Sequence, residues 1–170
     1  MSDVLSRWNR LSADEAARQI LDCCGSAAWA RELTARRPFP EDLSLVRVSD
    51  EIWSRLKPDD WMEAFSRHPR IGERKAPSAA SAQSATWSAQ EQQSVAGSEL
   101  AVQSALAEAN RAYEQRFGRV FIVCASGKSA SEMLEILRRR MHNDDAAELR
   151  EAAEEQRKIT NIRLKKWLSQ

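Results

Sequence analysis

Three capping boxes set the strongest limit on how this chain can fold: Ser12-x-x-Glu15, Ser88-x-x-Glu91 and Ser129-x-x-Glu132. In a capping box the serine hydroxyl accepts a hydrogen bond from the backbone N–H three residues later, and the glutamate accepts one from the backbone N–H of the serine. Each box therefore predicts the start of a helix. The 170 residues hold only five glycines and five prolines, fewer turns than a β-sandwich needs. We therefore expect an all-α fold.

Caps and stop signals predict where the helices lie. The first begins at Ser12 and ends at Gly25, and the others are expected over 26–37, 50–56, 59–67, 88–117, 129–141 and from 143 almost to the C-terminus. Residues 120–125 are an apolar run without a partner run, which favours an extended segment packed among helices. Residues 73–87 are predicted to form a surface loop or movable lid. The whole chain, 1–170, is expected to be a single-domain compact bundle of about eight helices with a short extended segment near 120–125.

Charge and cysteine content exclude several classes of function. The net charge of +1 offers no broad basic field for nucleic acid, and a local basic run, Arg138 to Arg140, is typical of a solvated helix end. No apolar run is long enough to span a membrane, and none resembles a signal peptide. Three cysteines, an odd number, favour reduced thiols in the cytoplasm. Two histidines without zinc-ligand spacing predict no metal site.

The segment His68-Pro69-Arg70-Ile71-Gly72 is the strongest candidate for chemistry. It follows a predicted helix directly, and Pro69 restricts His68 to an extended conformation that ends this helix. An imidazole has an ordinary pKa near neutrality, which suits general acid–base catalysis. The alternative, an exposed loop histidine, is equally compatible with the sequence alone.

Glu91 is a second candidate, and two interpretations of it are open. On a continuous helix it shares an inward face with Val95, Val102, Leu106, Ala109 and Tyr113. That phase predicts an inward carboxylate at a helix start, although Glu99 falls in the same sector. The capping box with Ser88 explains the spacing fully and is the favoured interpretation.

Arg163 interrupts the apolar stripe of the last predicted helix, which is formed by Leu149, Ala152, Gln156, Ile159 and Trp167. Such an arginine either extends its guanidinium to the rim, which is the favoured interpretation, or is buried with a partner. A buried guanidinium that faces a pocket is suited to hold a carboxylate through two parallel hydrogen bonds.

Two further patterns have ordinary explanations. Ser126-Gly127-Lys128-Ser129 resembles part of a phosphate-binding loop, but Ile122 stands where that loop needs its first glycine. A tight turn into a helix cap at Ser129 is favoured. The backbone amides of such a turn are also able to bind an anion. Cys124 lies within an apolar run, which favours a buried, inert thiol over a nucleophile.

Taken in order, these residues resemble a known family. The series is Arg37-Pro38-Phe39, Phe65-x-x-His68-Pro69-Arg70-Ile71-Gly72, Ser88-x-x-Glu91-Gln92, Asn110-x-x-Tyr113-x-x-x-Phe117-Gly118-x-x-Phe121-Ile122, Gly127-Lys128-Ser129, Met133-Leu134 and Ile159-x-x-x-Arg163-Leu164. It is similar to the decarboxylases of 2-oxo-4-hydroxy-4-carboxy-5-ureidoimidazoline (OHCU), which act in urate degradation. The resemblance covers nearly the whole chain.

The resemblance implies an all-helical, homodimeric carboxy-lyase without metal or cofactor. Such an enzyme converts OHCU to S-allantoin and carbon dioxide by general acid–base catalysis. His68 and Glu91 match the catalytic residues. The positions that match substrate-binding residues are Pro69, Ser88, Ala89, Gln90, Glu91, Gln92, Phe121, Ile122, Val123, Cys124, Ala125 and Arg163. His68 and Glu91 remain alternatives for delivery of the final proton.

A different class of function also fits the sequence. Amphipathic helices and six tryptophans suit a non-catalytic helical protein-interaction module as well as an enzyme core. Near-neutral charge and the inward positions predicted for Glu91 and Arg163 favour the enzyme. A phosphate-ligand binder that uses Gly127-Lys128-Ser129 is the second alternative.

Overall fold

The computed structural model describes residues 1–72 and 80–170. Over these residues the chain forms helices and no strand, which confirms the predicted all-α fold. The helices are α1 (Asp3–Trp8), α2 (Ala13–Cys24), α3 (Ala27–Ala35), α4 (Asp42–Arg55), α5 (Pro58–Ser66), α6 (Ala82–Glu91), α7 (Gln93–Ala96), α8 (Leu100–Phe117), α9 (Ala130–Arg140) and α10 (Asp145–Leu168). Among these described helices, none has an apolar stretch long enough to cross a lipid bilayer.

The chain divides into two compact units. The first unit comprises Met1–Ala64 with Arg157–Gln170, and the second unit comprises Phe65–Gln156. The second unit is thus continuous in sequence, while the first is assembled from the two ends of the chain. The last helix, α10, begins in the second unit and ends in the first.

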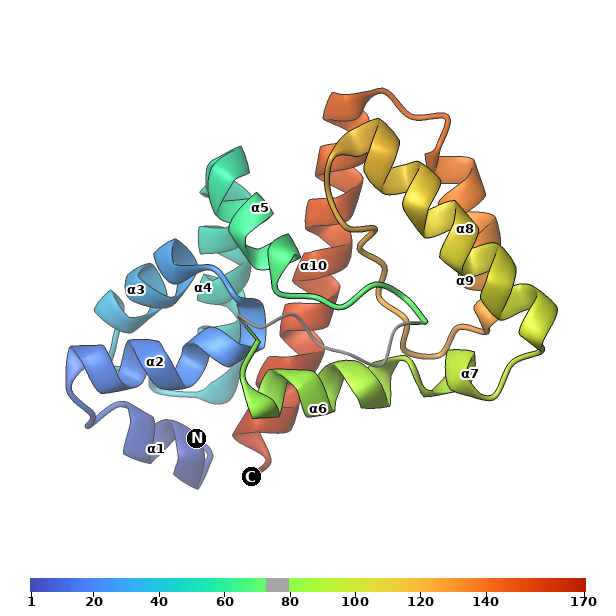
Figure 1. Ribbon diagram of the computed structural model, residues 1–170. Coiled ribbons are helices and arrows are strands. Elements are labelled where there is room, and N and C mark those ends of the chain that lie inside the picture. Colours follow the sequence, from blue (N-terminus) through green and yellow to red (C-terminus); the bar gives the residue numbers. More distant parts are fainter. Residues whose placement is uncertain (73–79) are drawn as a thin grey trace. The chain divides into compact units, whose positions relative to one another are not determined.

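The first unit is built on α1 to α4, drawn from blue to cyan in Figure 1, on most of α5 and on the last turns of α10. Tryptophans fill its core and satisfy their N–H groups. Trp8 donates to the carbonyl of Ala16 at 2.9 Å, and Trp29 donates to the hydroxyl of Ser49 at 3.1 Å. Trp8 also meets the ring of Trp167 edge to face, with ring centroids 5.8 Å apart. The terminal turns of α10 are therefore part of this core.

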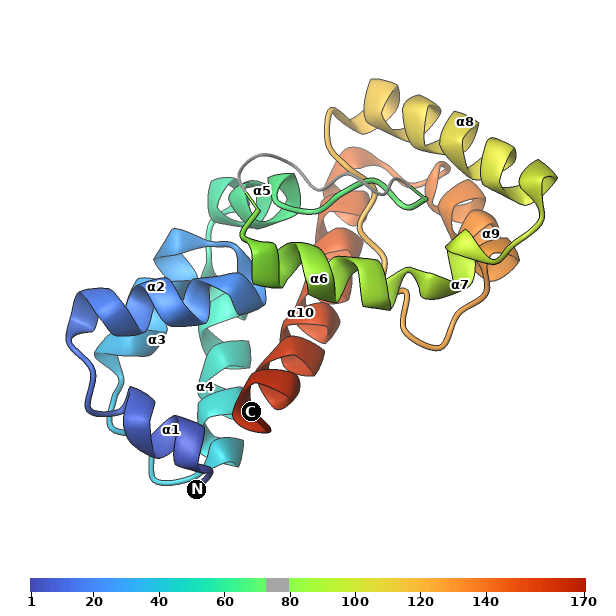
Figure 2. The same ribbon diagram turned by 60° about the horizontal axis from the view of Figure 1, so that its bottom comes forward.

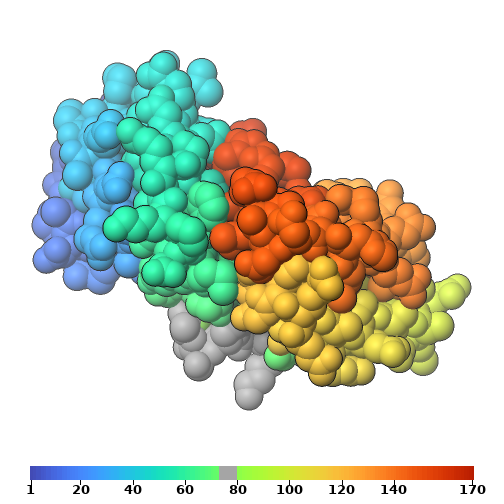
Figure 3. Space-filling model, turned by 90° about the horizontal axis from the view of Figure 1, so that it is seen from above, coloured from blue at the N-terminus to red at the C-terminus, as the bar shows by residue number. Residues whose placement is uncertain are grey.

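The second unit packs α8 and α9 side by side (Figure 2). Its core contains Ile71, Val95, Leu106, Tyr113, Phe117, Phe121, Val123, Ala125, Ala130, Met133, Leu134 and Leu137. The segment 120–125 is neither helix nor strand, and Phe121 to Ala125 are buried. The predicted extended segment packed among helices is therefore confirmed. At the surface in Figure 3, the end of α8 and the residues after it adjoin the first turns of α10, where Arg119 pairs with Asp145 at 2.9 Å.

Two of the three predicted capping boxes are confirmed. Ser12 and Glu15 form a complete box at the start of α2, and Ser129 and Glu132 form another at the start of α9. Gly25 ends α2 in the left-handed conformation, with φ of 92°.

The prediction of one helix over 88–117 is wrong. Ser88 lies inside α6, whose cap is Ser81, and the chain then forms α6, the short α7 and α8. Gly97 is a poor helix former, and Glu99 is extended, so the helix is interrupted before Leu100. Residues 82–87 are consequently helical and not part of a loop, while residues 73–79 of the predicted loop lie outside the described residues.

Candidate active site

His68 follows α5 by two residues and is 8% exposed. Its Nε2 lies 2.7 Å from Oε1 of Gln156, which is fully buried in α10. An amide oxygen only accepts, so this contact places a proton on Nε2 and makes Nδ1 the basic nitrogen of the neutral ring. The alternative of an exposed loop histidine is therefore wrong.

The three residues after Pro69 are each fixed by a polar contact. Arg70 forms a two-point ion pair with Glu114, with Nε 2.5 Å and Nη2 2.9 Å from the two carboxylate oxygens. The carbonyl of Ile71 accepts from the side-chain amide of Asn110 at 2.9 Å. The backbone N–H of Gly72 donates to Oε1 of Gln92 at 2.9 Å. The segment 68–72 (the His68 segment) is thereby held in one conformation, as an acid–base residue requires.

Gly72 itself adopts φ of +91°, in the left-handed region that favours glycine. The conformation turns the chain at the end of the His68 segment. This turn gives a physical reason for glycine at the last position of the motif.

The segment Phe121–Ala125 is fixed through its backbone. The carbonyl of Ile122 accepts from Arg140 at 2.6 Å, and the N–H of Cys124 donates to Oε2 of Glu155 at 2.7 Å. The carbonyl of Cys124 accepts from Lys128 Nζ at 2.7 Å. All three of these backbone groups are thus already engaged by side chains of the protein.

Adjacent residues of α10 link the two segments. Glu155 binds the backbone of Cys124, and Gln156 binds the ring of His68. Because the two side chains leave neighbouring positions of one helix, the His68 segment and Phe121–Ala125 meet in the same region of the second unit.

Arg140, which supports Ile122, belongs to a buried ion pair with Glu148. Both side chains are 0% exposed, with Nη2 and Oε1 2.5 Å apart. Glu148 also accepts from the hydroxyl of Tyr113 at 2.5 Å and from Asn143 at 2.9 Å. Burial, followed by the hydrogen bond to Glu148, raises the pKa of Tyr113. The expectation of a solvated basic run over Arg138 to Arg140 is therefore wrong for Arg140.

Glu91 is the last residue of α6 and is half-buried. The buried residues Ser84, Trp87 and Ser88 precede it by seven, four and three positions, so all four share one face of α6. Glu91 is near enough to Cys124 for its charge to contribute to the raised pKa of that thiol, of which burial is the largest cause. Glu91 therefore lies near Phe121–Ala125, although neither the capping box nor the continuous-helix phase explains why.

The other residues of the 88–92 stretch differ in exposure. Ser88 is buried and Gln92 binds Gly72, while Ala89 and Gln90 are exposed. Pro69 is buried beside His68. Three residues of the stretch, Ser88, Glu91 and Gln92, are thus at least partly buried with the site.

Arg163 belongs to the first unit and is 2% exposed. The favoured interpretation, a guanidinium at the rim, is therefore wrong. Burial raises the thiol pKa of Cys24 to about 12, and the positive charge of Arg163 is one of the influences that lower it. The guanidinium is a buried cation in the core of its unit.

The turn that resembles a phosphate loop is the tight turn into a helix cap that the sequence favours. Gly127 has φ of +77° and Ser129 caps α9. The ammonium group of Lys128 donates to the carbonyl of Cys124, and its backbone N–H donates to the carbonyl of Ala125 at 3.0 Å. Across the described residues, no cluster of three or more His, Cys, Asp or Glu is arranged to hold a metal ion.

Several residues of this site were missed from the sequence: Glu155, Gln156 as the partner of His68, Arg140 and Glu148. A signal existed for Arg140, because it continues the buried spacing of Ala130, Met133, Leu134 and Leu137 along α9. For Glu155 and Glu148 we find no sequence signal that separates them from the other acidic residues of α10.

The family model described as OHCU decarboxylase matches residues 9–165. The chain belongs to the OHCU decarboxylase family. The family resemblance stated from the motifs is thereby confirmed, and the match includes the His68 segment, Glu91, Phe121–Ala125 and Arg163.

Two curated relatives of this OHCU decarboxylase-family chain are larger proteins. It is 35% identical over 147 residues to the "Uric acid degradation bifunctional protein TTL" of Arabidopsis thaliana, covering 86% of this chain and 45% of the relative. It is 25% identical over 163 residues to the "Uric acid degradation bifunctional protein" of Bacillus sp. (strain TB-90), covering 94% and 31%. The chain thus spans less than half the length of each relative.

Two solved structures are similar to it. One is an OHCU decarboxylase in the presence of (S)-allantoin, with a TM-score of 0.76, 34% identity, and coverage of 89% of this chain and 98% of that one. The other is an (S)-allantoin synthase, with a TM-score of 0.68, 18% identity, and coverage of 96% and 53%. The second likeness shows the fold alone.

Proposed function

We propose that this chain is a carboxy-lyase that decarboxylates OHCU to (S)-allantoin and carbon dioxide in urate degradation. The observation that carries the proposal is the buried His68, hydrogen-bonded to Gln156 on a segment that is held at Arg70, Ile71 and Gly72, in a chain of the OHCU decarboxylase family. The similar structure with (S)-allantoin supports the nature of the product.

The reaction breaks one carbon–carbon bond and forms one carbon–hydrogen bond. The bond to the carboxylate breaks, carbon dioxide leaves, and the electron pair remains on the ring carbon. The conjugated C=N system of the substrate delocalises this pair until a proton arrives on one face. The protein then has to orient the substrate, stabilise the developing charge and move one proton.

In this proposal His68 acts as general acid–base, and Gln156 orients its imidazole ring through the contact at Nε2. Glu91 orients the substrate or the proton of His68. Pro69, the stretch 88–92 and the segment Phe121–Ala125 form the substrate-binding surface. For Arg163 we keep the substrate-binding role that the family resemblance implies, because a buried guanidinium is suited to hold a carboxylate.

The test follows allantoin by circular dichroism after urate oxidase and the ring hydrolase have generated OHCU. General acid–base catalysis contributes about 10²–10⁴-fold to a rate, so we expect His68→Gln to lower the rate by at least about 10²-fold. His142→Gln is the matched control, since His142 is exposed and its loss leaves the rate unchanged. A rate for His68→Gln within about threefold of the wild type, well short of the general acid–base range, refutes the role of His68.

Gln156 is a positioning residue in this scheme. Gln156→Leu removes the acceptor from Nε2 while it keeps the volume of the side chain, so we expect kcat to fall and its pH profile to shift, with KM changed less. A loss of stability without a shifted pH profile indicates that Gln156 is merely structural.

The remaining alternatives have their own tests. If the wild-type protein fails to accelerate allantoin formation over the spontaneous reaction, the non-catalytic interaction module is the better interpretation. We also propose a homodimer, which sedimentation at several concentrations tests directly.

A further inference from the structure

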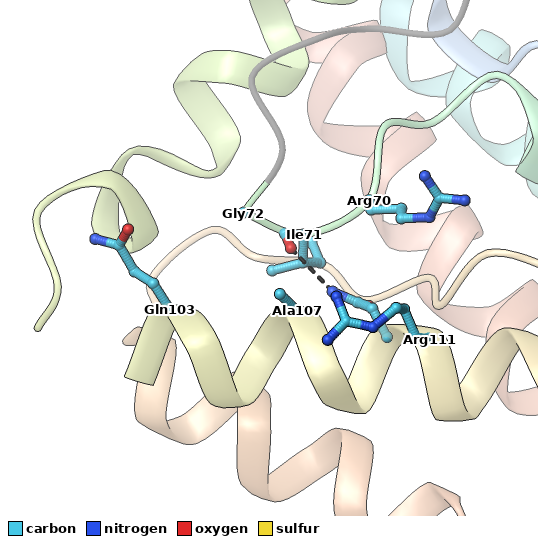
Figure 4. Close-up of a pocket in the computed structure, with 7 residues that line it drawn as sticks. Arg70, Ile71, Gly72, Gln103, Ala107 and Arg111 are labelled. Carbon is cyan, nitrogen blue, oxygen red and sulfur yellow. Dashed lines mark hydrogen bonds between the residues drawn. The ribbon is translucent and has the colours of Figure 1, made fainter. Parts of the chain in front are cut away.

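The second unit contains a pocket that the proposed function does not use. It has a volume of about 230 Å³ and is lined by Arg70, Ile71, Gly72, Gln103, Ala107, Asn110 and Arg111. Figure 4 shows Gln103, Ala107 and Arg111 on successive turns of α8, opposite the chain from Arg70 to Gly72. We call it the α8 pocket. Its described lining includes neither His68, Glu91 nor Phe121–Ala125.

A buried acceptor lacks a partner in this pocket. Asn110 is 2% exposed, and its Nδ2 donates to the carbonyl of Ile71 at 2.9 Å, drawn as the dashed line in Figure 4. Because only the NH₂ end can donate to a carbonyl, this bond fixes the orientation of the amide. Oδ1 then has no hydrogen-bond partner in the part of the chain that the structure describes. Buried acceptors are rarely left unpaired in native proteins, so Oδ1 is suited to accept from a ligand.

The charge of the lining points to an anion. Two guanidinium groups, Arg70 and Arg111, border the α8 pocket, and no acidic residue is among its described lining. Arg70 is paired with Glu114. Arg111 is exposed, and no carboxylate within residues 1–72 and 80–170 forms an ion pair with it. Arg111 is therefore the cation that remains for a ligand.

We propose that the α8 pocket binds a small carboxylate that carries an amide or ureido N–H. The carboxylate pairs with the planar guanidinium of Arg111, and the N–H donates to Oδ1 of Asn110. The volume of about 230 Å³ is below the roughly 300–1,000 Å³ of sites for drug-sized ligands, so the ligand has few heavy atoms. N-carbamoylglycine has both groups and this size.

A ligand in the α8 pocket contacts Arg70, Ile71 and Gly72, the residues that continue from His68. Binding is nevertheless independent of the proposed decarboxylation. Its test is therefore made without catalysis, and it can succeed or fail whether or not the chain is active.

The experiment titrates ¹⁵N-labelled protein with N-carbamoylglycine to about 20 mM, which reaches millimolar dissociation constants. We expect saturable NMR shifts at the side-chain amide of Asn110 and the backbone amides of Gly72 and Arg111. Arg111→Ala removes a charge-assisted pair and should weaken binding by about tenfold or more. Arg138→Ala is the matched control, because Arg138 is exposed on α9 and does not line the pocket.

Two comparisons separate the pocket from other sites. Propionate has the carboxylate without the N–H, so it should bind more weakly and leave the Asn110 side-chain amide nearly unshifted. N-carbamoylglycine also resembles the ureido part of the proposed substrate, so the titration is repeated with His68→Gln, which should retain the shifts. Absence of saturable binding, shifts confined to His68 and Phe121–Ala125, or full affinity in Arg111→Ala overturns the proposal.

Discussion

Arg139 and Arg140 are neighbours in sequence. Together they test how burial changes the contribution of an ion pair to the free energy of unfolding. Arg140 and Glu148 are both 0% exposed. Arg139 pairs with Glu151, and these side chains are 60% and 32% exposed. Removing one partner of a buried pair costs about 3–5 kcal/mol because the other charge stays buried and uncompensated. An exposed pair contributes only about 0–1 kcal/mol.

We therefore expect Arg140→Met to lower the free energy of unfolding by about 3–5 kcal/mol and Arg139→Met by less than about 1 kcal/mol. For a chain of this size each kcal/mol shifts Tm by about 2–4 °C. The loss of Tm should thus be roughly 6–20 °C for Arg140→Met and only a few degrees for Arg139→Met. Thermal and urea unfolding, followed by circular dichroism at 222 nm, measure both values.

A double variant separates charge from packing. In Arg140→Met with Glu148→Gln, the glutamine still accepts from Tyr113 and leaves no buried charge. We expect it to recover at least about 1 kcal/mol relative to the sum of the single changes. The reasoning is wrong if Arg140→Met destabilises no more than Arg139→Met, or if the two changes at 140 and 148 are additive.

Three shorter predictions concern backbone, thiols and acid. Gly72→Ala should lower the free energy of unfolding by about 1 kcal/mol or more, because φ is +91°; the new Cβ itself meets Val95 at an ordinary 3.6 Å. Gly97→Ala should not lower it, because φ is −94° and a Cβ there meets open space. Urea unfolding compares the two variants. Burial raises the pKa of Cys124, so a disulfide reagent at pH 8 should leave this thiol unmodified in the native protein and react with it in urea. Hydrogen bonds from Ser129 lower the pKa of Glu132, so its ionised form stabilises the protein above the ordinary carboxyl pKa; the difference in Tm between wild type and Glu132→Gln should shrink as the pH falls through the folded pKa.

Local signals predicted the fold where they act within one turn of helix. Ser12 and Ser129 cap helices because each side chain and its glutamate are only three residues apart. Ser88 fits the same pattern and fails, because Ser81 caps the helix first and Ser88 then lies on its buried face. The Ser-x-x-Glu pattern indicates only that a cap can form. Packing of the neighbouring turns decides which serine forms it.

Contacts across the chain decided the parts of the site that could not be predicted. His68 stood out as a residue, but its partner Gln156 lies 88 positions away. Arg163 was expected at the rim because a lone arginine usually keeps its charge in water, yet it is buried. The role proposed for Glu91 comes from the family resemblance alone. The argument from helical phase assumed a continuous helix over 88–117, and this helix does not exist.

The division of the chain also affects the order of its biosynthetic folding. The second unit is complete once residues 65–156 have left the ribosome, but the first unit needs residues 157–170 to finish its core. Trp8 cannot form its edge-to-face contact until Trp167 has been synthesised. Pairing of such distant segments is slow and exposes apolar surface meanwhile. We therefore expect α1 to α4 of a nascent chain to be the part that most needs a chaperone, although they are made before the second unit.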